Sequence, residues 1–276
     1  MDKNQDFQSL WISLATLPEV EALALGGSRA GNQYDERSDY DLYVYCDNIP
    51  NKEARKAILE PYCQYLELNN TFWEVEDDAI LNNGIPIDII YRSLEDFGQN
   101  LHQVVQDHVA YNGYTTCLWH NLLKSKILYD PKGKLERLQD QYDIEYPEAL
   151  RQNILHKNWR LLTNNLPSYD TQIHKAMDRQ DLVSVNHRMA AFLESYFDLL
   201  FALNSLTHPG EKRMVTYLKE NATILPNHFE ENINTLFEVL FTDPNKAMQI
   251  LQTMVAEVAL LLEKENEKYK DQRSDL

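Results

Sequence analysis

Two neighbouring segments decide the fold: LALGGSRAG at residues 23–31 and SDYDLYVY at residues 38–45. The first is an apolar run that ends in Gly-Gly-Ser, and the second is an apolar run headed by Asp39 and Asp41. In an extended strand, residues two apart point to the same face, so these two carboxylates project together. Adjacent like charges repel unless a cation lies between them, and Mg²⁺ is held by one or two carboxylates plus substrate phosphates. The pair therefore predicts a metal site.

The Gly-Gly-Ser turn supplies the other half of the site. Gly27 lets the backbone approach a ligand, and exposed N–H groups together with the Ser28 hydroxyl can hold phosphate oxygens. A dinucleotide fingerprint is excluded because its third position, counted from Gly26, is Ser28, and a P-loop is excluded because Asn32 and not Lys follows Gly31. A phosphate cradle beside a metal-binding acid pair predicts chemistry on a nucleoside triphosphate.

The combination resembles the signature of the nucleotidyltransferase superfamily whose core is like that of DNA polymerase β. That signature is Gly-Gly/Ser, a polar gap, and Asp-x-Asp/Glu within an apolar strand. The resemblance implies a third carboxylate on a later strand, and Asp88 lies in the otherwise apolar run 85–91. An unpaired charge would be costly there, so Asp88 needs the metal or the acceptor hydroxyl as its partner.

More narrowly, the chain resembles the small bacterial aminoglycoside and lincosamide nucleotidyltransferases, which carry a helical C-terminal domain. The resemblance implies an α+β nucleotidyltransferase fold, a mixed sheet flanked by helices, over residues 1–143. An all-α helical bundle over residues 144–276 is expected to follow, with the most apolar helix, 181–206, at its centre. A length of 276 residues accommodates two domains of ordinary size.

The mechanism implied by this resemblance gives Asp39 and Asp41 to Mg²⁺ and leaves two roles open for Asp88, second metal ligand or general base. In the resembling families the base can also come from the helical domain, where Glu194 is the best candidate. Related enzymes bring a lysine to the triphosphate from the region of Lys212.

Basic residues are also needed at the β- and γ-phosphates. Arg29 and Arg37 flank the site in sequence and are candidates for that contact. The phosphate-binding set predicted from the sequence is therefore Gly27, Ser28, Arg29, Arg37 and Lys212, with ATP or another nucleoside triphosphate as co-substrate.

Composition limits the partners. The net charge is −17, from 26 basic and 43 acidic residues, which argues against nucleic-acid binding. The same acidity fits either a cationic small substrate or solubility alone. No apolar run approaches a membrane span, and the first residues lack a signal-peptide core. The three cysteines are scattered without metal-ligand spacing, so a cytoplasmic protein is expected.

We therefore expect an adenylyltransferase that moves AMP from ATP to a hydroxyl of a small, cationic acceptor such as an aminoglycoside, an antibiotic-resistance activity. Two alternatives stay open: a nucleotidyltransferase that modifies a protein partner in toxin–antitoxin fashion, and a catalytically silent nucleotide-sensing module. A sugar-nucleotide glycosyltransferase would share Asp-x-Asp but has no place for Gly-Gly-Ser. The acceptor, the nucleotide base, the general base and the oligomeric state are not fixed by the sequence.

Hydrophobic periodicity predicts the remaining elements. Strands are expected over residues 20–25, 42–46, 65–68, 71–75, 85–91 and 126–130. Helices are expected over residues 6–17, 51–62, 93–109 and 115–125, and a further helix is expected to end at about residue 142. Beyond residue 147, helices are expected over residues 148–165, 172–179, 181–206, 211–220, 227–241 and 245–269.

Overall fold

A computed structural model describes residues 5–31, 38–72, 74–163 and 165–274. It divides into two compact units, which we call the sheet unit (within residues 1–107 and 118–145) and the helical unit (within residues 108–117 and 146–276). The sequence places the boundary after residue 143, whereas the structure places it after residue 145. The structure also assigns the segment 108–117, here named the strap, to the helical unit, although sheet-unit helices flank the strap in sequence.

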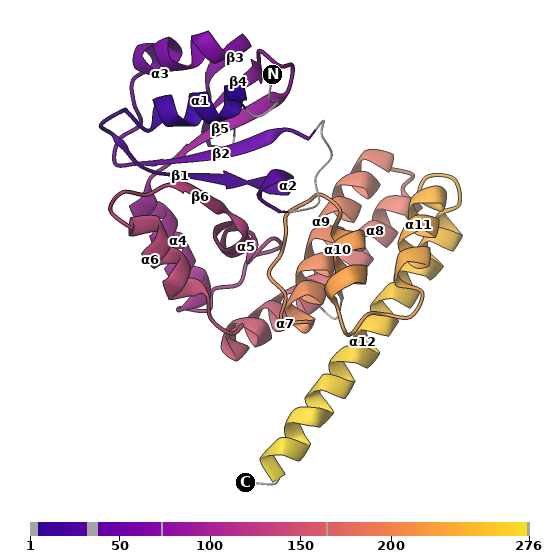
Figure 1. Ribbon diagram of the computed structural model, residues 1–276. Helices are drawn as coiled ribbons and strands as arrows, with labels where there is room; N and C mark the ends of the chain where they lie inside the picture. The colour runs from indigo at the N-terminus through magenta and orange to yellow at the C-terminus, as the bar shows by residue number, and fades with distance from the viewer. Residues whose placement is uncertain (1–4, 32–37, 73, 164, 275–276) are drawn as a thin grey trace. The chain divides into compact units, whose positions relative to one another are not determined.

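The sheet unit is built on one six-stranded mixed sheet (Figure 1). Its strands are β1 Val20–Gly26, β2 Tyr40–Cys46, β3 Cys63–Asn70, β4 Val75–Leu81, β5 Pro86–Arg92 and β6 Lys126–Tyr129. Their order across the sheet is β3-β4-β5-β2-β1-β6. Strands β2 and β5 are parallel, and the other neighbouring pairs are antiparallel. This mixed sheet with its helices confirms the α+β class.

Where the structure describes this unit, it has seven helical segments: α1 Gln5–Leu14, α2 Gly27–Ala30, α3 Lys52–Leu59, η1 Glu60–Tyr62, α4 Leu94–Val105, α5 Cys117–Lys124 and α6 Lys134–Tyr142. Helices α1 and α3 cover one face of the sheet (Figure 1), where Leu10, Leu14 and Leu59 are fully buried against the strands. That face holds the apolar positions of β1, β2 and β5, among them Leu23, Leu25, Leu42, Val44, Ile87 and Ile89. Burial of these side chains is the main source of the unit's stability.

The opposite face of the sheet pairs small residues with large ones. Strand β1 presents only small residues there, and each is in register with a larger residue of β2: Ala22 with Tyr45, Ala24 with Tyr43, and Gly26 with Asp41. The alternation ALALG in β1 therefore has two functions. Its leucines build the core, and its small residues leave room for the side chains of β2.

The strand predicted over residues 71–75 is wrong in position, because β4 runs over Val75–Leu81 instead. The segment Glu76-Asp77-Asp78 disfavours a strand by propensity. The structure accommodates it by burying Asp77 completely. Its carboxylate lies 3.5 Å from the Arg55 guanidinium and accepts hydrogen bonds from the Tyr91 hydroxyl (2.9 Å) and the Asn69 amide (2.8 Å). A tertiary charge pair thus overrides the local preference.

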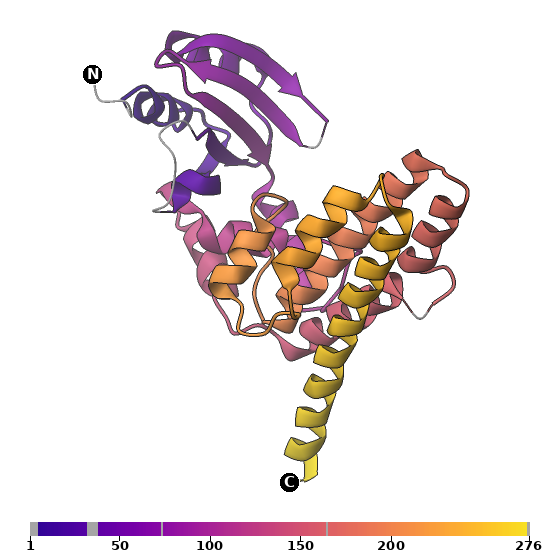
Figure 2. The same cartoon turned by 90° about the vertical axis from the view of Figure 1, so that its right-hand side faces the viewer.

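The described residues of the helical unit form six helices: α7 Glu148–Leu162, α8 Tyr169–Asp178, α9 Leu182–Leu203, α10 Met214–Asn221, α11 Phe229–Val239 and α12 Pro244–Ser274. Helix α9 is the most deeply buried of them, with every residue from Ser195 to Leu203 inside the unit. It packs against α7 and α8, while α12 packs along α11 and extends past it (Figures 1 and 2). No helix in the described part of the chain has the length and apolar character needed to cross a membrane.

The buried pair Arg55–Asp77 gives the first prediction. Asp77→Ala should lower the free energy of unfolding by about 3–5 kcal/mol, because the guanidinium would stay buried without its counter-charge. Glu230→Ala is the control, since Glu230 pairs with Lys219 on the exposed surface and its loss should cost at most about 1 kcal/mol. Urea denaturation measures both, and equal effects would contradict this account.

Candidate active site

The Asp41 carboxylate lies directly against the backbone of Gly27. A Cβ added to Gly27 would fall 1.7 Å from Oδ2 of Asp41, so any other residue at this position would displace the carboxylate. Gly27 also has a φ of +59°, the left-handed region that favours glycine. Conformation and space therefore require glycine independently, and the result is a carboxylate seated on the turn that leaves β1.

The turn offers N–H donors beside that carboxylate. The short helix α2 begins at Gly27, and the first N–H groups of a helix have no intrahelical acceptor. Ser28 follows, and both Gly27 and Ser28 are exposed to solvent. Donors of this kind are the ones that phosphate oxygens accept from.

Asp41 and Asp88 are brought together by the sheet. They are register partners on the parallel strands β2 and β5, and neighbouring strands lie about 4.8 Å apart. Each carboxylate is partly exposed. Asp39 lies one residue before β2 and is also partly exposed. Two of the three acids predicted from sequence therefore share one face of the sheet at adjacent positions.

The acidic row continues beyond the predicted pair. Asp88 is in register with Asp78 of β4, and Asp78 with Glu67 of the edge strand β3. Sequence reasoning missed Asp78 because its strand was placed too early. On the same strand, burial together with the neighbouring Asp78 and Asp88 raises the pKa of Glu76. Acidic residues therefore occur on every strand of this face from β2 to the sheet edge.

Arg29 has a position that the sequence does not reveal. Its Nε donates a hydrogen bond to the Ser38 carbonyl (2.6 Å), and its guanidinium carbon lies 4.1 Å from the centre of the Tyr40 ring. The side chain is largely buried. These contacts link the turn after β1 to the start of β2. Phosphate binding by Arg29 stays a prediction, and Arg37 lies outside the described residues.

The helical-unit candidates Glu194 and Lys212 lie in different settings. Glu194, on α9, is partly exposed and contacts the strap. A Cβ added to Gly113 of the strap would fall 2.9 Å from the Cβ of Glu194. Burial, followed by the charges of Glu194 and Glu211, raises the pKa of the neighbouring Tyr114. Lys212 is exposed on the connection between α9 and α10. Their roles stay predictions.

A buried carboxylate fixes the strap to the helices. Asp198 of α9 accepts hydrogen bonds from the amide (3.0 Å) and hydroxyl (2.7 Å) of Thr115 and from the Asn158 side chain (3.0 Å). Burial raises its pKa to about 6. The next strap residue, Thr116, accepts a bond from the His208 amide (2.9 Å). This network positions the strap, and with it Gly113 and Tyr114, beside Glu194.

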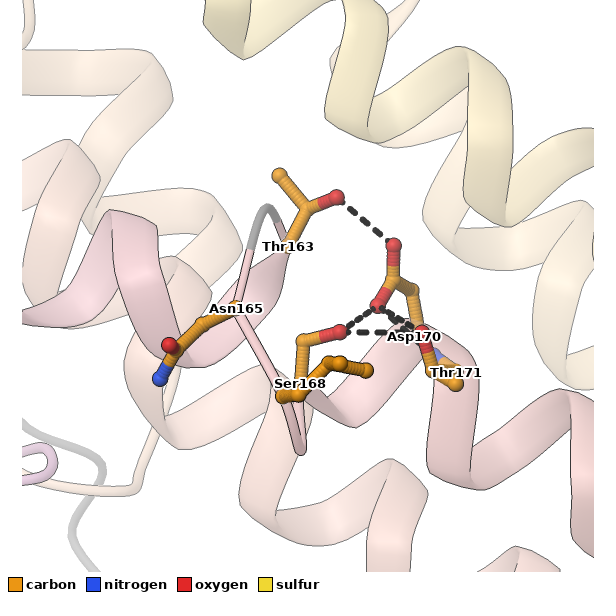
Figure 3. A pocket seen from close by; sticks show the side chains of 6 residues that line it. Thr163, Asn165, Ser168, Asp170 and Thr171 are labelled. Atoms are coloured by element: carbon orange, nitrogen blue, oxygen red, sulfur yellow. Dashed lines mark hydrogen bonds between the residues drawn. The ribbon is translucent and has the colours of Figure 1, made fainter.

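Two surface hollows are lined by residues of the helical unit alone. In the first, between α7 and α8, the hydroxyls of Thr163, Ser168 and Thr171 point toward the Asp170 carboxylate (Figure 3). That carboxylate also accepts from the Thr171 amide at 2.6 Å. These polar groups at the start of α8 therefore satisfy one another. The second is apolar and lies between the ends of α8 and α11.

The two neighbouring carboxylates on the sheet are a donor set that suits a magnesium ion. Within the described ranges, no group of three or more histidine, cysteine, aspartate or glutamate side chains is arranged to hold a metal by itself. Asp41 and Asp88 supply two neighbouring carboxylates. Mg²⁺ characteristically takes one or two carboxylates and completes its shell with water and substrate phosphates.

Comparison with known families gives one match. A family model described as a domain of unknown function (DUF4037) covers residues 115–214. The matched stretch begins within the strap, runs through α5, β6 and α6 of the sheet unit, and continues to the start of α10. The Gly-Gly-Ser turn, Asp41 and Asp88 lie outside it. A search among curated proteins gave no significant match.

Three solved structures are similar at low identity. A nucleotidyltransferase-like protein from Exiguobacterium sibiricum 255-15 is 12% identical, with 95% of this chain and 74% of that chain covered and a TM-score of 0.42. An aminoglycoside 6-adenyltransferase from Bacillus subtilis is 10% identical, with 99% and 98% covered and a TM-score of 0.28. A CCA-adding enzyme in complex with ATP is 12% identical, with 94% and 82% covered and a TM-score of 0.28.

The contact between Gly27 and Asp41 gives the second prediction. Gly27→Ala should lower the free energy of unfolding by about 1–2 kcal/mol through the left-handed conformation alone, and further because the methyl group displaces the Asp41 carboxylate. Gly31→Ala is the matched control. Its φ is −88° and its nearest neighbour would be 3.7 Å from the new methyl, so the change should stay within about 0.5 kcal/mol. Urea unfolding of the ligand-free proteins distinguishes the two, and similar losses would count against the contact.

Proposed function

We propose that the protein is a metal-dependent nucleotidyltransferase. It transfers a nucleoside monophosphate, AMP from ATP as the first choice, to a hydroxyl of a small cationic acceptor such as an aminoglycoside. One observation carries the proposal: the Asp41 carboxylate contacts the Gly27 turn and is in register with Asp88. Groups suited to a metal ion and groups suited to phosphate thus lie at one place on the sheet, which supports the proposal.

The groups of the chain take defined parts in this reaction. The N–H groups of the turn and the Ser28 hydroxyl would bind phosphate oxygens, and Asp41, with Asp39 beside it, would hold Mg²⁺. Asp88 would either add a carboxylate to the ion or act as the general base. When bound, the ion orients the triphosphate and neutralises charge on it. A bond forms between the acceptor oxygen and the α-phosphorus, and the bond from that phosphorus to the pyrophosphate oxygen breaks. The hydroxyl proton passes to a carboxylate, for which Asp88 and Glu194 are the candidates.

The acidic row supports a cationic acceptor. Once Mg²⁺ neutralises the charges near Asp41 and Asp88, the negative potential of Asp78, Glu76 and Glu67 is left on the same face of the sheet. Clefts and surfaces of one sign raise the local concentration of oppositely charged ligands. An amine-rich acceptor would therefore be attracted to the face where the nucleotide binds, and its binding should weaken as salt rises.

The third prediction tests the activity directly. The purified protein with Mg²⁺ and each nucleoside triphosphate should release pyrophosphate in the presence of an amine-bearing, hydroxyl-rich acceptor, and a panel of aminoglycosides and uncharged polyols compares the two acceptor classes. Asp41→Asn and Asp88→Asn should each reduce turnover at least ~100-fold, because a charge-neutral amide cannot hold the ion and phosphates in register.

Glu67→Gln is the control for this assay. It removes a charge at the exposed sheet edge, away from the turn, and should leave the affinity for Mg·ATP unchanged. Wild-type rates in Asp41→Asn would overturn the proposal. Turnover with a polyol but with none of the aminoglycosides would support nucleotidyltransferase activity and contradict the proposal of a cationic acceptor.

A further inference from the structure

The position of the phosphate-binding turn is fixed by an aromatic ring that the sequence motif does not include. A Cβ added to Gly26 would fall 2.1 Å from Cε2 and 2.9 Å from Cζ of Tyr43. The backbone of Gly26 is extended, with φ −105° and ψ −160°, a conformation that any residue adopts. Glycine is therefore needed at position 26 for one reason, which is that the Tyr43 ring lies in the place of a side chain.

The ring itself is held by groups from two other elements, α5 and β5. The Asn121 side chain of α5 donates a hydrogen bond to the Tyr43 hydroxyl (2.7 Å), and Arg92 at the end of β5 donates to the Asn121 oxygen (3.1 Å). The Arg92 guanidinium carbon lies 4.2 Å from the centre of the Tyr43 ring. Glu74 accepts two hydrogen bonds from that guanidinium, at 2.7 and 2.6 Å. Tyr43 is buried and has little freedom to move.

The two glycines of the turn thus rest on two side chains of one strand. Asp41 and Tyr43 lie on the same face of β2, with Asp41 against Gly27 and Tyr43 against Gly26. Moving the ring would move Gly26, and with it the N–H groups of the next residues. Positional errors of about 1 Å in a binding site can cost a large part of its function.

We propose that Tyr43 is a positioning residue of the nucleotide site. It acts through Gly26 to set the phosphate-binding turn beside Asp41, and Asn121 and Arg92 fix the ring in that place. The inference rests on the proposed function, because it assigns Tyr43 to the same nucleotide site. It also gives the stretch matched by the family model, through Asn121, a part in that site.

The test is a double-mutant cycle on Gly26 and Tyr43, read by calorimetry of Mg·ATP binding to the full-length protein. Gly26→Ala alone should weaken binding at least ~10-fold, because the methyl group and the ring cannot share the space. Tyr43→Val frees that space, so adding Gly26→Ala to it should cost less than ~3-fold more. A merely structural role would lower thermal stability but leave the affinity of each folded variant for Mg·ATP unchanged.

Asn121 provides a second approach that leaves the ring in place. Asn121→Ala should weaken Mg·ATP binding, and Asn121→Asp should restore it, because the Tyr43 hydroxyl can then donate to the carboxylate. Should Tyr43→Val fail to fold, this pair decides the question. Additive effects in the cycle, or unchanged affinity in Asn121→Ala, would overturn the inference while leaving the nucleotide site standing. Absence of Mg·ATP binding by the wild-type protein would instead overturn the proposed function itself.

Discussion

The contact between the Asp41 carboxylate and the Gly27 backbone is the constraint on which the candidate site depends. It exists because β1 and β2 are antiparallel neighbours whose register places Gly26 opposite Asp41. The large residues of β2 are accommodated by the small residues of β1 on that face, and the leucines of β1 pack into the core on the other. Any shift of this register by one residue would reverse both faces and separate the acid from the turn.

Local chemistry in the sequence was enough to propose a site. Glycines before a serine, followed by two acids spaced for one strand face, pointed to the turn, Asp39 and Asp41, and the resemblance to the nucleotidyltransferases added Asp88. The apolar periodicity predicted most helices and strands. The strand predicted over residues 71–75 was wrong because propensity cannot anticipate Arg55, which is distant in sequence from Asp77 and allows it to be buried. The contributions of Tyr43 and Asn121 were hidden for the same reason, since each depends on a contact between separate elements.

The domain boundary at the strap was also not predictable from the sequence, because it depends on contacts between distant residues. Residues 108–117 lie between two sheet-unit helices, so a linear boundary assigns them to the sheet unit. Their hydrogen-bonding groups are instead satisfied in the helical unit, by Asp198 through Thr115 and by Lys157, which donates to the Ala110 carbonyl (2.7 Å). A buried acceptor must be satisfied, and Asp198 is satisfied by the strap and by Asn158. Such hydrogen bonding depends on the tertiary fold, and the local sequence pattern does not indicate it.

A structure of the protein soaked with Mg²⁺ and a non-hydrolysable ATP analogue would test the central claim most directly. The account predicts that phosphate oxygens bind the N–H groups at Gly27 and Ser28, and that the ion lies between those phosphates and the carboxylates of Asp41 and Asp88. A nucleotide bound elsewhere, or one whose phosphates contact neither the turn nor a metal on Asp41, would contradict it.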